Sequence, residues 1–174
     1  MKQAMCALAV AGSMSLGVAV ARAQGVNDAQ IASIVVTANQ VDIDAGKLAE
    51  SQASSPEVKA FGKQMVTDHT GVNKQATELV TRLKVKPEDN PTSKSLASGG
   101  NENVKHLQQL KGAAFDKAYV DHEVAYHQQV LDAVDKTLIP SAQNADLKAL
   151  LVKVRPAFVA HLEHAKHLQS SLTK

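Results

Sequence analysis

The sequence contains few of the residues on which several common protein classes depend. Its 174 residues include one cysteine, no tryptophan, two tyrosines and three phenylalanines. So few aromatic rings argue against an aromatic-rich β-sandwich and against a surface on which nucleic-acid bases stack. The one cysteine, Cys6, lies near the N-terminus. A chain that has lost its N-terminal segment therefore has no thiol for a disulfide bond or for thiolate catalysis.

Neither sign of charge is in marked excess. The chain has 19 basic and 17 acidic residues, and its formal net charge is +2. Removal of residues 1–23 would also remove Lys2 and Arg22, so the 19 basic residues would become 17 and would balance the 17 acidic ones. A neutral chain gives no electrostatic reason to bind nucleic acid or an anionic membrane surface.

The first 23 residues have the features of a secretory signal peptide. Lys2 provides a basic start, residues 4–20 are mostly apolar, and an Ala-Arg-Ala motif ends at Ala23. We expect cleavage before Gln24, which leaves one domain, residues 24–174, in the periplasm or associated with the outer membrane. A retained membrane helix is the alternative, but the apolar run is short and rich in Ala, Gly and Ser. We expect no transmembrane segment in the mature chain.

Apolar residues recur at helical spacing in four long segments of the remaining chain. These segments are approximately residues 27–52, 56–86, 113–138 and 145–172. The turn between the first two is short, which makes them antiparallel neighbours. We find no strand pattern and no glycine-rich phosphate loop. The sequence therefore predicts an all-α protein, an antiparallel four-helix bundle.

A long connection is predicted between the second and third of these helices. No apolar period survives from Lys86 to Asn101, and this stretch contains two prolines and two adjacent glycines. We expect it to be an irregular segment that crosses the end of the domain, followed by a short helix from Val104 that breaks near Gly112. In the last helix, Pro156 is expected to cause a kink because it removes a backbone donor.

Each of the four predicted helices carries, on its apolar face, one side chain of a type that can bind a metal ion. These side chains are Asp42, His69, His127 and His161. With a rise of about 1.5 Å per residue, the first three lie at roughly one height, and His161 lies about one turn higher. Three imidazoles and a carboxylate that converge in a bundle core are suitable ligands for Zn(II), Cu(II) or Ni(II).

A metal-free polar network is the alternative interpretation of the same residues. Asp42 would then accept a hydrogen bond from His69 or His127 and would fix the register of the helices. In either interpretation we expect Asp68 and Glu123 to be outer partners of these side chains or to face solvent.

Three further residues are candidate metal ligands. Glu123 and His127 are four residues apart, and His161 and His164 are three apart, so each pair shares a helix face. His122 lies close to the predicted height of His161. The additional candidates are therefore His122, Glu123 and His164, although we expect His164 to be mainly exposed.

Several sequence runs resemble an exported bacterial family called domain of unknown function 4142. The runs are residues 42–49, 55–62, 65–70 and 115–120, together with His127 and with Pro156 followed by His161. The resemblance covers about residues 27–170. It implies a ferritin-like four-helix bundle in the bacterial envelope, and family members are often described as outer-membrane proteins without an established activity. The family's histidines correspond to His69, His127 and His161, and Asp42 replaces its usual glutamate.

The resemblance does not extend to ferritin chemistry. Ferritin-type di-iron sites use a glutamate followed three residues later by a histidine on two helices, and this sequence has no such pair. A di-iron oxidase or an iron store is therefore not expected.

Three functions remain open from the sequence. The first is an exported periplasmic protein that binds a transition metal in envelope stress or homeostasis. The second is a metal-free structural or interaction module, which uses an exposed face or the segment from Lys86 to Asn101 to meet an envelope protein or a second copy. An enzyme is less favoured, because no nucleophile and base are arranged recognisably.

Overall fold

The structure is a computed structural model in which residues 25–173 are described, and every regular element among them is helical. The all-α prediction is therefore confirmed, whereas the predicted signal peptide lies outside the described residues. None of the described helices is long and apolar enough to cross a membrane. The elements are α1 (Asp28–Gln52), α2 (Pro56–Arg82), α3 (Pro91–Leu107), α4 (Gly112–Ala133), the π-helical turn η1 (Val134–Leu138), α5 (Ile139–Ser141) and α6 (Ala145–Leu172).

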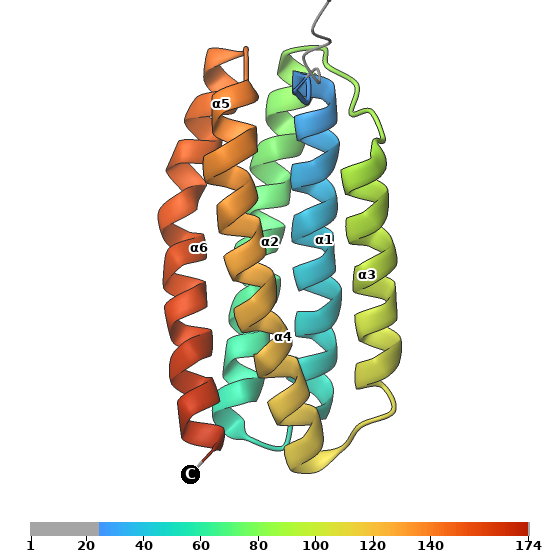
Figure 1. Cartoon of the computed structure of the whole chain (residues 1–174), viewed down its shortest axis with the longest axis vertical. Coiled ribbons are helices and arrows are strands. Elements are labelled where there is room, and N and C mark those ends of the chain that lie inside the picture. The colour runs from blue at the N-terminus through green and yellow to red at the C-terminus, as the bar shows by residue number, and fades with distance from the viewer. Residues whose placement is uncertain (1–24, 174) are drawn as a thin grey trace, which may run out of the picture.

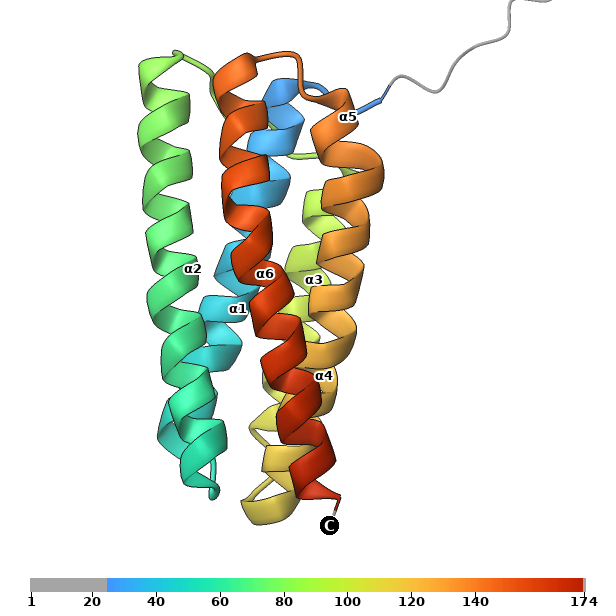
Figure 2. The same ribbon diagram turned by 90° about the vertical axis from the view of Figure 1, so that its left-hand side faces the viewer.

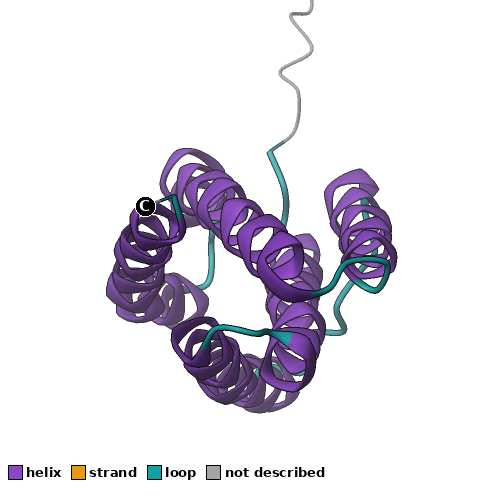
Figure 3. Cartoon of the chain, turned by 90° about the horizontal axis from the view of Figure 1, so that it is seen from below, coloured by secondary structure: helices purple, strands orange, loops and turns teal. Residues whose placement is uncertain are grey.

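The long helices run up and down one common axis (Figure 1). Figure 2 shows α6 beside α4 and near α2, and in both views successive long helices point in opposite directions. In the view along the axis, one long helix stands outside the others (Figure 3). The outer helix is α3, which packs mainly against α1.

Local sequence signals set the ends of the first two helices. The Asn27 side chain accepts a hydrogen bond from the backbone of Gln30, and the Ser55 side chain accepts one from Val58. Pro56 occupies the first turn of α2, where no backbone donor is lost. The buried carboxylate of Asp116 at the start of α4 accepts backbone hydrogen bonds at 2.8 Å from the turn between α1 and α2. This contact fixes the lower end of α4 against the first helical pair.

The prediction of an irregular connection after α2 is wrong, because most of that segment is α3. Its N-terminus is capped by Asn90, whose side chain accepts from two backbone amides and donates to the carbonyl of Gln30 at 3.2 Å. Few large apolar residues face α1, and the helices instead meet at Gly100. A Cβ atom placed there would lie 2.5 Å from Cγ2 of Val41. Small residues permit this close packing and leave no apolar period in the sequence.

The core consists of two apolar clusters with polar side chains between them. On each central helix, the polar residue lies between members of the two clusters. Asp42 lies between Val35 and Ala45, His69 between Val72 and Met65, His127 between Leu131 and Val120, and His161 between Phe158 and Ala165. The helix α6 continues through Pro156, so this proline does not divide the element that carries His161.

Substitution of the two adjacent glycines of α3 tests its packing on α1. Gly99→Ala should raise the free energy of unfolding by about 0.5–1 kcal/mol, because nothing lies near its added Cβ and alanine favours a helix. Gly100→Ala should lower it by about 1–3 kcal/mol, because α3 must move away from Val41. Urea unfolding of both variants measures the difference. Equal stabilisation by the two substitutions would contradict the packing described for α3.

Candidate metal centre

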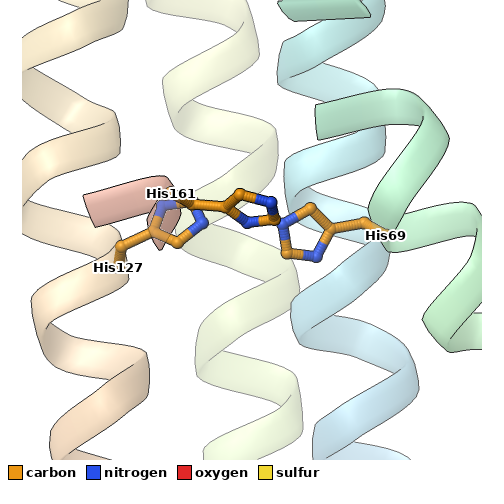
Figure 4. A group of neighbouring side chains, drawn as sticks. All are labelled: His69, His127 and His161. Carbon is orange, nitrogen blue, oxygen red and sulfur yellow. The ribbon is translucent and has the colours of Figure 1, made fainter. Parts of the chain in front are cut away.

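Three histidines from three helices meet in the centre of the protein (Figure 4). The ring of His69 on α2 lies 5.6 Å from that of His127 on α4 and 5.2 Å from that of His161 on α6, and the last two are 5.4 Å apart. We call these residues the histidine trio. Each is at most 2% exposed. One ring nitrogen from each lies within 4.8 Å of the others.

The sequence-based height of His161 is wrong by about one turn. The ring of His161 lies 5.2 Å from that of His69 and 5.4 Å from that of His127, so the three rings share one level. A height that is counted along one helix contains no information on the register between helices.

His69 is held in one tautomer by Asn39, which the sequence analysis did not identify. Nδ1 of His69 lies 2.7 Å from the side-chain oxygen of Asn39, and the Asn39 amide group donates to the carbonyl of Val35 at 2.7 Å. Since an amide oxygen only accepts, Nδ1 of His69 carries the proton. Nε2 of His69 is buried and has no hydrogen-bond partner among the described residues. An asparagine three residues before Asp42 on an apolar face was the available signal.

His161 is oriented by an acidic residue of α2. Its Nε2 lies 2.9 Å from the carboxylate of Asp68, which is the next residue before His69. A carboxylate accepts the hydrogen bond, so Nε2 carries the proton. Nδ1 is then the unprotonated nitrogen, and it is buried without a partner among the described residues.

His127 is oriented from within its own helix. Its Nδ1 lies 3.1 Å from the backbone oxygen of Glu123 and 3.3 Å from the Glu123 carboxylate. Its Nε2 is buried and has no partner in the part of the chain that the structure describes. Glu123 is itself completely buried, although the sequence left open whether it faces solvent.

All three imidazoles therefore have one nitrogen held by an acceptor and the other nitrogen without a partner. Metal-binding histidines have this arrangement, because the outer hydrogen bond fixes the ring and its tautomer. The nitrogen ligands of a tetrahedral Zn(II) ion with bonds of about 2.1 Å lie about 3.4 Å apart, so the ring nitrogens of the trio, which are within 4.8 Å of one another, must move inward to bind one ion. Neutral imidazoles suit Zn(II), Cu(II) and Ni(II).

Asp42 belongs to a second group of side chains. Asp42, Glu123 and His127 each offer one ligand atom, and these atoms lie within 4.8 Å of one another. We call these three residues the carboxylate group. Oδ2 of Asp42 also lies 3.6 Å from Nδ1 of His69, which is the same nitrogen that Asn39 holds. The structure thus brings the four predicted ligands close together but divides them between two groups that share His127.

Burial and mutual charge shift the pKa values in both groups. Burial lowers the pKa of His69 well below its usual value, and the other two imidazoles lower it further. Burial raises the pKa of Asp42, and the charge of Glu123 adds to this effect. For His127, burial lowers the pKa, but the Glu123 hydrogen bond and the Asp42 charge outweigh it and raise the pKa to about 9. A proton on His127 or a bound cation therefore compensates the buried carboxylates at neutral pH.

The remaining candidate ligands lie outside the trio. His122 is partly buried, and its Nδ1 lies 4.0 Å from the Glu123 carboxylate. His164 is exposed and packs its ring edge-on against Phe61 at 4.9 Å. His122 therefore lies beside the carboxylate group, whereas His164 takes no part in either group.

Comparison with known protein families gives one match. The sequence profile of a domain of unknown function, DUF4142, matches residues 14–168. Curated proteins and solved structures give no match. The matched segment contains all of α1, most of α6 and all residues of the histidine trio. Because the match covers most of its length, this chain belongs to the DUF4142 family.

Proposed function

We propose that this protein is an exported helical protein that binds one transition-metal ion through His69, His127 and His161. The observation that carries the proposal is that each of the three imidazoles has one buried nitrogen without a hydrogen-bond partner among the described residues. The other nitrogen of each ring is held by a hydrogen-bond acceptor. An unsatisfied buried polar group costs about 1–3 kcal/mol. Three such groups cost an amount comparable to the stability of a whole domain, about 5–15 kcal/mol. A shared metal ion removes this cost.

The ligand types favour Zn(II), Cu(II) or Ni(II). All three ligands of the trio are imidazoles, and no glutamate with a histidine three residues later supports a ferritin-type di-iron site. Three protein ligands leave one position of a tetrahedral ion for water or another small ligand. We assign the protein to metal binding in envelope homeostasis or stress rather than to catalysis.

The surrounding fold supports a ferritin-like bundle. The helices α1, α2, α4 and α6 carry Asp42, His69, His127 and His161 and run in alternating directions (Figures 1 and 2), and metal sites in such bundles are built from side chains on facing helices. In this proposal α3 is an addition outside the four central helices. An experimental structure in which α3 replaces one of the four around the trio would contradict it.

Export to the periplasm or the outer membrane rests on the N-terminal sequence. The basic start, the apolar run and the Ala-Arg-Ala motif ending at Ala23 support removal of residues 1–23. N-terminal sequencing of the protein from the envelope fraction of cells should give Gln24 as the first residue. Recovery of the full-length chain from the cytosol would contradict export.

Zinc titration of chelator-treated protein tests the metal site. The wild type should bind one Zn(II) per chain, and His69→Ala or His161→Ala should each weaken binding at least about 100-fold, because two imidazoles remain. Asp68→Asn should weaken it about 10- to 100-fold, because it leaves the trio intact but changes the acceptor that orients His161. Isothermal calorimetry with a competing chelator measures the affinities.

A matched control comes from the same helix. His164→Ala removes an exposed imidazole three residues after His161 and should leave zinc affinity unchanged. Equal zinc affinity of the His161→Ala and His164→Ala variants would contradict the metal site. Together with lower stability of the His161→Ala variant, that result would favour the metal-free structural or interaction module.

A further inference from the structure

A set of buried polar atoms remains that the histidine trio does not use. Five side-chain atoms of α1 and α4 are buried without a hydrogen-bond partner among the described residues. They are Asp42 Oδ1, Tyr119 Oη, His122 Nδ1 and both carboxylate oxygens of Glu123. Asp42, Tyr119 and Glu123 are at most 3% exposed. This part of the core is therefore too polar for an ordinary packing region.

The atoms of Asp42, His122 and Glu123 lie close to one another. Asp42, Glu123 and His127 offer ligand atoms within 4.8 Å of one another, and Nδ1 of His122 lies 4.0 Å from Glu123. Tyr119 precedes Glu123 by four residues on α4 and so shares its helix face. Burial raises the pKa of Tyr119, and the charges of Glu123 and Asp42 raise it further.

Apart from His127, whose pKa they raise, the two carboxylates have no strong cationic partner among the described residues. Their ion pairs involve only the imidazoles of His69, His122 and His127, and no lysine or arginine of the described residues pairs with them. Two carboxylates that are both buried are stable in the ionised form only with compensating positive charge. A divalent cation supplies this charge and also gives partners to the oxygens that have none.

We propose that Asp42, Glu123 and His127, supported by the hydroxyl of Tyr119, form a second cation site that is distinct from the histidine trio. His127 presents Nδ1 to Glu123, whereas its Nε2 is the nitrogen without a partner. The two nitrogens of one imidazole point in different directions, so ions at the two groups lie on different sides of the ring. A cation bound at Nδ1 displaces the proton of that nitrogen to solvent.

The ligand types distinguish the second site from the first. Mn(II) prefers oxygen ligands such as carboxylates, whereas a set of three imidazoles suits Zn(II), Cu(II) or Ni(II). The second site is therefore expected to take Mn(II) in preference to Cu(II) or Ni(II). This inference goes beyond the proposed function, and it does not require an ion in the trio. When both sites are filled, His127 bridges the two ions as an imidazolate and both of its ring protons go to solvent.

A surface groove provides a route to this site. The groove lies between α3 and α4, has a volume of about 490 Å³, and is lined in part by Leu96, His122 and Tyr126. Since His122 lies in the groove and its Nδ1 is 4.0 Å from Glu123, an entering cation meets this imidazole before the buried carboxylates.

Titration with MnCl₂, with free Mn(II) followed by electron paramagnetic resonance, tests the proposal on the metal-free mature chain. The His161→Ala variant, in which the trio is broken, should still bind one Mn(II) per chain. In that background, Asp42→Asn and Glu123→Gln should each weaken Mn(II) binding at least about 10-fold, because each replaces a charged ligand by a neutral amide of similar shape. Tyr119→Phe should weaken it several-fold while it keeps the ring in place.

Matched controls are an exposed acid of α1 and a partly exposed acid of α4. Asp44→Asn on α1 and Asp121→Asn on α4 remove a negative charge near the substituted positions and should leave Mn(II) affinity unchanged. Circular dichroism should show equal helicity for all variants. If Asp42→Asn or Glu123→Gln fails to fold, the comparison of Tyr119→Phe with its parent decides the question.

Three results would overturn the second site. The first is no Mn(II) binding by the His161→Ala variant, and the second is equal binding by the carboxylate variants and their controls. In the third, Asp42→Asn and Glu123→Gln abolish zinc binding as completely as His161→Ala does. That result would show that the two groups form a single site. The zinc titration of the trio variants independently decides the proposed function, so the two failures are distinguishable.

Discussion

The hydrogen bond that holds one nitrogen of each imidazole is the interaction on which this structure depends. Asn39 on α1 holds His69 on α2, and Asp68 on α2 holds His161 on α6. These two bonds connect three helices at one level, and His127 on α4 completes the layer. The same bonds leave the second nitrogen of His69 and of His161 unprotonated in the protein centre, and a metal ion would displace the proton from the second nitrogen of His127. The contacts that fix the helices therefore also create the candidate metal ligands.

The polar layer is tolerated because apolar packing surrounds it. One apolar cluster lies on each side of the layer along the helices, and the ring of His69 stacks on Phe158 at 5.4 Å. Hydrophobic burial in these clusters offsets the cost of desolvating imidazoles and carboxylates. A polar layer of this kind lowers the free energy of unfolding of the metal-free protein, and a bound cation then raises it by a larger amount. Stability and cation binding are thus expected to be coupled in this fold.

The sequence predicted the parts of the protein that follow helical periodicity. It placed the four central helices and put His69, His127 and His161 on their apolar faces, because each lies in a line of large apolar residues. It missed α3, because that helix packs through Gly100 and has few apolar residues. It also missed the role of Asn39, whose contact with His69 depends on the register between α1 and α2. Periodicity within one helix contains no information on that register. Glu123 was found as a candidate because it lies four residues before His127 on the same helix.

The central claim is that three imidazoles bind one ion, and X-ray absorption of the protein loaded with one equivalent of Zn(II) tests it most directly. The account predicts three imidazole nitrogens at about 2.0–2.1 Å from zinc, with the remaining position filled by one oxygen. This pattern should be absent from the His69→Ala variant. A zinc environment of oxygens with one imidazole or none, or an identical spectrum for wild type and variant, would contradict the account.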